Sequence, residues 1–261
     1  TTVSRRNDFN DRYAAALLSD GNTLYMIYRK TSDVVDIQST TNLGGNWSDA
    51  TDPNIGSPRV HAAFKWWDES GNYVRVLATE NGLWDITAAP ATEIIPGLTV
   101  APDLFNGVST KVAPNGKLYY PVTATGDVIE IEHLGSGRFI ATNIGPGSLN
   151  DGLPTEWQGH VTSMTATAKW LFVAYGGHAA NKHATVLAYD YEERAWHCVF
   201  ENNTSNNDIT FIILSTENDD SDRLHIVMEG TATTDVEFQE GILRDPLDGT
   251  ARERNASAVL T

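Results

Sequence analysis

A phrase of two β-strands joined by a polar turn recurs five times along the 261 residues of this chain. The first three copies turn at Ser19-Asp20-Gly21-Asn22, Glu69-Ser70-Gly71-Asn72 and Pro114-Asn115-Gly116-Lys117. The second strands of the five copies begin about 44 to 53 residues apart, a spacing typical of proteins built from repeated structural units. Those strands begin at Leu24, Val74, Leu118, Leu171 and Leu224. The repeat therefore limits the fold more than any single residue does.

A third stretch of β character follows each two-strand phrase, and a fourth often opens on an aromatic residue. The third stretches are 34–38, 83–86, 128–132, 185–189 and 236–239. The fourth stretches open at Trp47, Phe139 and Trp196. Four antiparallel strands per unit match a propeller blade, and blades stacked around an axis bury faces that a lone sheet leaves exposed. The sequence predicts an all-β fold, a β-propeller of about five blade-like four-stranded repeats, with a long β-sandwich as the alternative.

The repeats divide the chain at regular intervals. Their approximate ranges are 10–55, 56–105, 106–150, 151–205 and 206–250. Residues 251–261 are interpreted as a tail or as the start of a further blade. We expect a single propeller domain over 1–261, which either closes with five blades or forms part of a larger six- or seven-bladed ring. Thr1 to Arg6 has no β pattern with which to close the ring, and this favours the larger one.

Charge and composition exclude several classes of partner. The chain has 34 acidic and 18 basic side chains, for a net charge of -16. This charge repels phosphate backbones and anionic membranes, so no nucleic-acid partner and no membrane insertion are expected. No run approaches the roughly 18 apolar residues of a membrane helix. Cys198 is the single cysteine, which excludes an intramolecular disulfide and a thiolate metal cluster.

The segment from Thr40 to Trp47 resembles the Asp-box of sialidase-type propellers, with Asn in place of the usual Asp. Thr40, Asn42, Gly44 and Trp47 occupy the four motif positions. The resemblance implies a tight turn in which the Asn side chain bonds to the backbone, Gly supplies a positive φ and Trp packs between blades. A single degenerate copy supports the fold and does not imply sialidase activity.

No catalytic signature is complete, so no catalytic residue is assigned. Sialidases bind a carboxylate with three arginines, but their Arg-Ile-Pro signature is absent here. The arginines available for such a triad are Arg5, Arg29, Arg59 and Arg75. Asp52-Pro53-Asn54 and Arg244-Asp245-Pro246 are similar to elements of invertase-like glycosidases, but their order is wrong and Asp-Pro is a common turn.

Histidines are the candidates for a metal site. His178 and His183 share one loop, but the sequence offers them no clear third ligand. We therefore expect no metal and no cofactor. His61 and His160 both stand where a connecting loop enters a first strand, and this suggests a repeated structural role.

The candidate ligand site follows from propeller architecture. Loops that enter a blade, and loops between its second and third strands, gather on one face around the axis. The loops so placed are 52–61, 86–108, 143–160 and 176–184. They provide groups that can stack on a sugar or hydrogen-bond to it. The predicted ligand-binding residues are Arg59, His61, Trp157, Gln158, His160 and Lys182. The alternative is that the loops only cap the ring or meet neighbouring subunits.

One part of the chain resembles the repeat unit of propeller-containing virion proteins of tailed bacteriophages. It runs from Asp151-Gly152-Leu153-Pro154 through Gly159-His160-Val161-Thr162 and continues to Ala195-Trp196-His197. The resemblance is clearest over residues 150–230. It implies a non-enzymatic, tail-associated protein of virion or extracellular location that acts in assembly or host-surface recognition. Its partners would be other virion subunits, its own oligomer or a cell-surface glycan.

The alternative function is a propeller-fold glycoside hydrolase, either sialidase-like or similar to invertases and arabinanases. Such an enzyme needs two carboxyl groups about 5 to 10 Å apart across the substrate. A pair of this kind on the loop-bearing face would favour the hydrolase.

Overall fold

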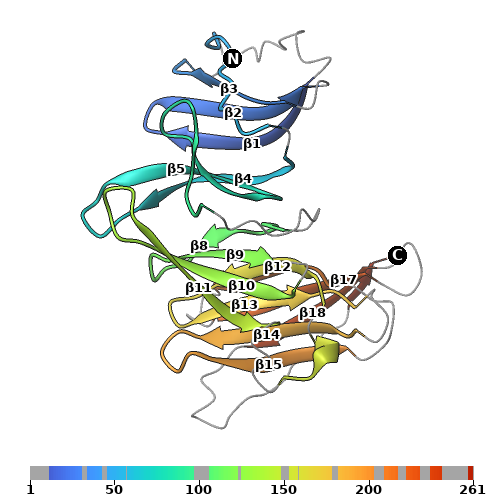
Figure 1. The fold of residues 1–261 in the computed structure, drawn as a ribbon. Coiled ribbons are helices and arrows are strands. Elements are labelled where there is room, and N and C mark those ends of the chain that lie inside the picture. Colours follow the sequence, from blue (N-terminus) through green and yellow to red (C-terminus); the bar gives the residue numbers. More distant parts are fainter. Residues whose placement is uncertain are drawn as a thin grey trace. The chain divides into compact units, whose positions relative to one another are not determined.

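A computed structural model describes residues 12–30, 34–42, 46–56, 58–96, 106–122, 125–147, 153–157, 159–177, 182–202, 209–216, 222–229, 236–242 and 258–260. In these ranges the secondary structure is β, apart from the 3-10 helix η2 (Thr155–Trp157). Five antiparallel sheets follow one another along the chain (Figure 1). The fold is of the all-β, β-propeller type that the repeat predicts. No helix of the described part is long and apolar enough to cross a membrane.

Each sheet is a meander, so strands that follow one another in the chain also pair. The first sheet is β1 (Arg12–Asp20), β2 (Thr23–Lys30) and β3 (Val35–Thr40). The second is β4 (Val60–Trp67), β5 (Tyr73–Thr79), β6 (Gly82–Asp85) and β7 (Thr92–Glu93). The third is β8 (Lys111–Val112), β9 (Leu118–Val122), β10 (Asp127–His133) and β11 (Phe139–Pro146). The fourth is β12 (Val161–Ala166), β13 (Trp170–Tyr175), β14 (Ala184–Asp190) and β15 (Ala195–Asn202). The fifth is β16 (Ile209–Thr216), β17 (Asp222–Glu229), β18 (Val236–Ile242) and β19 (Ala258–Leu260).

The glycines of the first three predicted turns have the backbone conformation that those turns require. Gly21, Gly71 and Gly116 have φ values of 58°, 80° and 80°. This left-handed region is costly for residues with a Cβ, so glycine fixes the reversal between the first and second strands. The predicted turn positions in the first three sheets are confirmed.

The first sheet has three strands, where the sequence predicted a fourth opening at Trp47. The chain does run beside β3 at this point: Ile37 and Thr51 exchange backbone hydrogen bonds of 2.9 and 2.8 Å, and Ser48 N donates to Ser39 O at 2.8 Å. The segment stays an isolated bridge because 46–53 is rich in Asn, Asp and Pro, which are depleted in strands.

The last described residues complete the fifth sheet. β19 pairs with β18, with Val236 opposite Leu260. The sequence placed 251–261 in a tail or in the start of a further blade. The structure gives Ala258–Leu260 the fourth-strand position of the preceding repeat instead. A connection of about 15 residues separates the two strands, so a regular spacing cannot identify this pairing.

The chain divides by its internal contacts into two compact units. Unit 1 comprises Thr1–Thr110 and Ile131–Ala141, and unit 2 comprises Lys111–Glu130 and Thr142–Thr261. The core of unit 1 contains buried Leu18, Ile27, Val35, Ile55, Leu77 and Ile86. The core of unit 2 is built mainly on Val161, Leu171, Val173, Tyr175, Leu187 and Tyr189. The expectation of one domain over 1–261 stays a prediction.

A buried aromatic stack explains why the hairpin Ile131–Ala141 belongs to unit 1. Trp66 of β4 is fully buried. Its ring lies 5.1 Å from His133 and 5.5 Å from Phe139, and these two rings are 4.8 Å apart. Burial lowers the pKa of His133, which favours the neutral imidazole in this stack. The three rings join the hairpin to the second sheet by apolar contact.

Candidate functional site

Two of the predicted ligand residues, Arg59 and His61, lie in unit 1 at the start of β4. Arg59 is exposed, and its backbone binds Glu80 in both directions. Arg59 N donates to Glu80 Oε1 and Arg59 O accepts from Glu80 N, each at 3.0 Å. His61 is half-buried within the strand. These contacts do not test whether Arg59 and His61 bind a ligand, so their role in ligand binding stays a prediction.

A β-bulge at the same point of four sheets identifies which positions are equivalent between blades. The pairing of first and second strands shifts by one residue near the start of four first strands. The shifts lie between Ala14 and Ala16, Val60 and Ala62, Val161 and Ser163, and Ile209 and Phe211. By this register His160 is equivalent to Arg59. Both carbonyls accept from the residue after the second strand, Gly176 N at 2.9 Å and Glu80 N at 3.0 Å. The suggested equivalence of His61 and His160 was wrong by two positions, because His61 is the extra bulge residue of its strand and its counterpart is Thr162.

The other predicted ligand residues belong to unit 2, and the structure brings two of them together. Trp157 is half-buried in η2 and packs against the core of unit 2. Lys182 Nζ donates to Thr155 O at 2.5 Å, which ties the loop before β14 to η2. His160 lies just before β12, and Gln158 lies outside the described residues. We call Trp157, Lys182, His183 and Glu201 the loop cluster.

Glu201 is the member of the loop cluster that the sequence did not indicate. It accepts a hydrogen bond from His183 Nδ1 at 2.6 Å and one from the Trp157 side chain. These two hydrogen bonds lower the pKa of Glu201, with the His183 bond the stronger cause. His183, a predicted metal candidate, is thus paired with a carboxylate, and His178 lies outside the described residues. Within the described ranges, no group of three or more His, Cys, Asp or Glu side chains could hold a metal ion.

The polar groups of the loop cluster are bonded within unit 2, either to Glu201 or to backbone carbonyls of η2. His183 N also donates to Glu156 O at 2.8 Å. Gly159 lies against Gly176, where an added Cβ would meet the Gly176 carbonyl oxygen at 2.1 Å. Only glycine permits such a close approach of two backbones. The cluster therefore fastens two loops and strand β15 together, and its Trp, Lys and Glu are held in fixed positions.

The turn after β3 contains the residues that resemble an Asp-box. Buried Thr40 donates through Oγ1 to Asn42 Oδ1 at 2.8 Å, and Asn42 Oδ1 accepts from Asn46 N at 2.9 Å. The Asn side chain thus bonds to the turn backbone, as an Asx turn does. Gly44 lies outside the described residues and Trp47 is half-buried. The assignment of these four residues to an Asp-box stays a prediction.

An exposed aromatic pair in unit 1 was missed by the sequence analysis. Strand side chains alternate between faces, so the buried Trp66 leaves Trp67 pointing outward, 49% exposed. Trp67 stands opposite Tyr73, which is 38% exposed, and their ring centroids are 5.7 Å apart. We call this pair, with the Lys65 and Asp20 side chains beside it, the aromatic ledge. A Trp-Trp doublet in a half-exposed strand is the signal that could have indicated it.

Charged groups hold the aromatic ledge in place. Lys65 Nζ lies 5.2 Å from the centre of the Trp67 ring and 5.3 Å from that of Tyr73. Asp20 accepts from Tyr73 OH at 2.9 Å and lies 3.4 Å from Lys65 Nζ. The hydrogen bond to Asp20 raises the pKa of Tyr73. The ledge therefore presents two fixed rings, with a cation over them and an anion at the Tyr73 hydroxyl.

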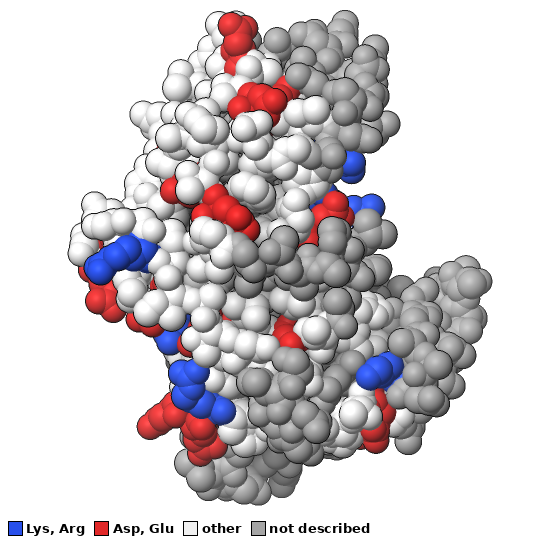
Figure 2. Space-filling view, viewed as in Figure 1, with Lys and Arg blue, Asp and Glu red and all other residues white. Residues whose placement is uncertain are grey.

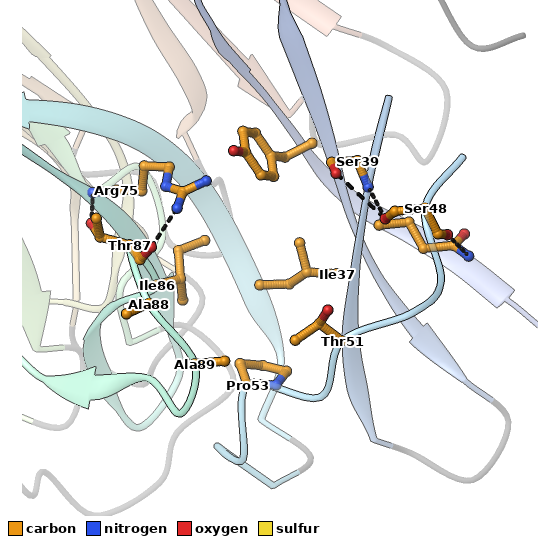
Figure 3. A pocket seen from close by; sticks show the side chains of 12 residues that line it. Ile37, Ser39, Ser48, Thr51, Pro53, Arg75, Ile86, Thr87, Ala88 and Ala89 are labelled. Carbon is orange, nitrogen blue, oxygen red and sulfur yellow. Dashed lines mark hydrogen bonds between the residues drawn. The ribbon is translucent and has the colours of Figure 1, made fainter. Parts of the chain in front are cut away.

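A cavity of about 150 Å³ lies close to the ledge, also within unit 1 (Figure 3). The cavity is lined by Tyr25, Ile37, Gln38, Ser39, Ser48, Thr51, Pro53, Arg75, Ile86, Thr87, Ala88 and Ala89. Arg75 follows Tyr73 by two residues in β5, so both point to the same face of the sheet. Its guanidinium lies 4.4 Å from the centre of the Tyr25 ring, and its Nη2 donates to Thr87 O. In the sequence, Arg75 was one of four arginines considered for a carboxylate-binding triad, and no motif distinguished it from the others.

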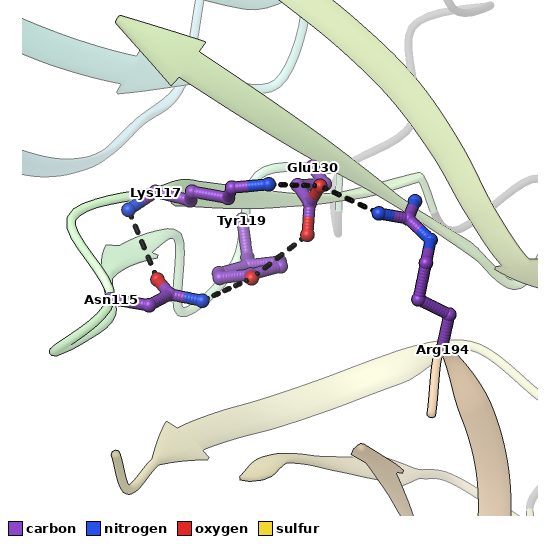
Figure 4. A network of polar contacts seen from close by, with 5 residues as sticks. All are labelled: Asn115, Lys117, Tyr119, Glu130 and Arg194. Atoms are coloured by element: carbon purple, nitrogen blue, oxygen red, sulfur yellow. Dashed lines mark hydrogen bonds and ion pairs between the residues drawn. The ribbon is translucent and has the colours of Figure 1, made fainter. Parts of the chain in front are cut away.

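A different arrangement surrounds the buried carboxylate Glu130 of unit 2 (Figure 4). Glu130 accepts from Lys117 Nζ at 2.8 Å and from Tyr119 OH at 3.0 Å, and Arg194 Nη1 lies 3.9 Å away. Asn115 Nδ2 donates to the Tyr119 hydroxyl at 2.9 Å. Burial raises the pKa of Tyr119 far above its usual 10.0, so the phenol stays a donor to Glu130. This network joins the third and fourth sheets within unit 2.

The surface carries both signs of charge. On the face drawn in Figure 2, acidic and basic side chains are interspersed. The acidic side chains on this face form several separate groups rather than one patch. A charged ligand would be selected by local groups rather than by one large field.

Solved structures similar to this chain are propeller-type proteins. YCF48 from Cyanidioschyzon merolae is 11% identical over 95% of this chain and 72% of its own, with a TM-score of 0.57. YCF48 bound to D1 peptide is 12% identical over 90% of this chain and 66% of that chain, with a TM-score of 0.54. A catalytically inactive virginiamycin B lyase from Staphylococcus aureus, solved with quinupristin, is 14% identical over 97% and 85%, with a TM-score of 0.53. No protein-family model and no curated protein sequence matches the chain. The likeness is one of fold.

Proposed function

We propose that this chain is a non-enzymatic, tail-associated propeller of a bacteriophage virion that acts in assembly or in recognition of host-surface glycans. The observation that supports recognition most directly is the aromatic ledge. The apolar face of a sugar ring can lie on Trp67 or Tyr73, while Lys65 and Asp20 are placed to bond its hydroxyl groups. The rings are already fixed, so binding loses little side-chain entropy.

The buried carboxylate Glu130 is bonded within the protein, which favours binding over hydrolysis at this position. A glycoside hydrolase uses one carboxyl group as an acid and a second as a base or nucleophile. Glu130, buried beside two cations, is engaged by Lys117 and Tyr119 and serves as a brace. Propeller folds serve both binding proteins and enzymes, so the fold alone favours neither function.

The virion location rests on the resemblance over residues 150–230. The described part of this stretch consists of regular strands and turns, β12 to β17, which suits a structural component. Mass spectrometry of purified phage particles tests the location. We expect this chain at a fixed copy number per particle, and its absence from particles that carry its gene would contradict the virion assignment.

Glycan recognition is tested on an array of bacterial surface glycans with the wild-type chain and two variants. Trp67→Ala should weaken binding to the glycans that the wild type retains by at least about tenfold, since a central aromatic anchor contributes about 2 kcal/mol or more. Ile140→Ala removes another exposed apolar side chain of unit 1, 50% exposed, and should bind as the wild type does. Equal losses in both variants would show that the ledge is not the site.

A further inference from the structure

The cavity beside Arg75 has an unusual charge for this protein. Its lining includes one cation, Arg75, and no aspartate or glutamate, although the chain has 34 acidic side chains. The other polar lining groups are hydroxyls and the Gln38 amide, and Ile37, Pro53 and Ile86 supply an apolar wall. An uncharged or cationic ligand would meet an uncompensated guanidinium here. An anionic group would be paired by it.

The guanidinium of Arg75 is held in place without a carboxylate. Nη2 donates to the Thr87 carbonyl, the Tyr25 ring lies beneath the charge at 4.4 Å, and Arg75 N donates to Thr87 Oγ1 at 2.9 Å. Among the described residues, Arg75 forms no ion pair. Lys65 and Lys117, in contrast, each have an acidic partner, at 3.4 and 2.8 Å. A half-buried cation fixed by neutral groups keeps an uncompensated positive charge with which to bind an anion.

The shape of the cavity limits the ligand to a small molecule. A cavity of about 150 Å³ has room for a body the size of one six-membered ring. Thr51 lines the cavity between Ile37 and Pro53 (Figure 3). The lining thus offers a cation at one side, a hydroxyl at another and apolar surface between them.

We infer that this cavity binds a small organic carboxylate, with the carboxylate paired to Arg75 and the ring or short chain against Ile37, Pro53 and Ile86. A planar guanidinium matches a planar carboxylate in shape and charge. The ligand class includes acid-bearing sugars and simple aromatic acids. The inference concerns the cavity alone and does not require the ledge to bind glycans.

Titration calorimetry and amide chemical shifts of the whole chain test this with sodium benzoate, sodium glucuronate and sodium acetate. Benzamide and glucuronamide are the uncharged counterparts, and sodium sulfate is the inorganic anion. We expect the two ring carboxylates to bind and to shift the amides of Ile86 and Thr87, with each amide counterpart at least about tenfold weaker. Three results would overturn the inference. They are equal affinity for an acid and its amide, an affinity for sulfate as high as that for benzoate, and no binding of any of the three acids.

Variants identify the residue responsible. Arg75→Gln should weaken benzoate at least about tenfold, whereas Arg138→Gln removes an exposed cation of the same unit and should change the affinity less than twofold. Similar losses in both variants would attribute binding to general charge and overturn the assignment to Arg75. If Arg75→Gln does not fold, Arg75→Lys keeps the charge and loses the planar fork, and its preference for benzoate over benzamide should shrink. An unchanged preference in Arg75→Lys would contradict carboxylate pairing.

Discussion

Arg75 in unit 1 and Glu130 in unit 2 are charged side chains in similar settings, each on an inner strand beside a neighbouring sheet. Glu130 has two cations and a phenol around it, so its charge is compensated and its position is braced. Arg75 contacts the Thr87 carbonyl and the Tyr25 ring, and it borders an open cavity. The loop cluster of unit 2 repeats the first pattern, because Trp157 and His183 bond to Glu201 and Lys182 bonds to the Thr155 carbonyl. The same repeated architecture thus compensates the charge of Glu130 inside unit 2 and leaves the charge of Arg75 in unit 1 without an acidic partner among the described residues.

The largest effect of this difference should be on stability at Glu130. Glu130→Gln leaves Lys117 and Tyr119 without their anionic acceptor, and we expect a loss of about 2 kcal/mol in the free energy of unfolding. Urea unfolding measures it, with the exposed Glu192→Gln of the same unit as the control. A loss no larger than that of the control would show that the network does not brace unit 2.

Arg75 should matter less for stability than for binding. Arg75→Gln removes one hydrogen bond to a carbonyl and one contact with the Tyr25 ring, which together contribute about 1 kcal/mol. Urea unfolding of this variant beside Glu130→Gln compares the two regions directly. If Arg75→Gln lowers the free energy of unfolding as much as Glu130→Gln does, Arg75 also stabilises the fold, and the contrast between the units is wrong.

The loop cluster should respond to acid. The folded-state pKa of Glu201 is lowered below its ordinary 4.5, so the stability that it contributes is present above pH 4.5 and is lost as the pH falls through the folded-state pKa. We expect the free energy of unfolding of Glu201→Gln to depend less on pH than that of the wild type between about pH 3 and pH 5. Unfolding free energies of wild type and variant over this range measure the effect, and identical pH profiles would contradict it.

The smallest effect concerns the ledge. Because its bond to Asp20 raises the pKa of Tyr73, Asp20→Asn should move that pKa back toward 10.0. An NMR titration of the tyrosine ring signals at alkaline pH detects the shift. No change would mean that Tyr73 and Asp20 are not bonded in solution, and the ledge would then be less rigid than described.

Much of the fold could be predicted, because it is encoded in short-range patterns. Turn glycines such as Gly71 and Gly116, and alternating strands between them, predict each hairpin from local sequence. The fourth strands β11 and β15 follow short turns and lie where the aromatic residues Phe139 and Trp196 predict them, whereas β19 pairs with β18 across a long connection. β19 therefore escaped prediction, and the segment after Trp47 was assigned a strand that it does not form.

The candidate sites were less predictable. Trp157 and Lys182 lie on segments that the hydrogen bond from Lys182 to Thr155 joins, and their role in ligand binding stays a prediction. Glu201 lies on strand β15, where the sequence gives no local signal of its contact with Trp157. The cavity draws on residues from Tyr25 to Ala89, so no motif marks it. A site assembled from short strand segments becomes visible only when their register is known.

The indole N–H signals of the chain, followed by NMR during a titration with sodium glucuronate, test the central contrast most directly. Glucuronate has both a sugar ring and a carboxylate, so it addresses the ledge and the cavity together. We predict a saturable shift of the Trp67 indole signal and of the Arg75 side-chain N–H, with the Trp157 indole unchanged. A shift at Trp157 without one at Trp67 or Arg75 would contradict the account.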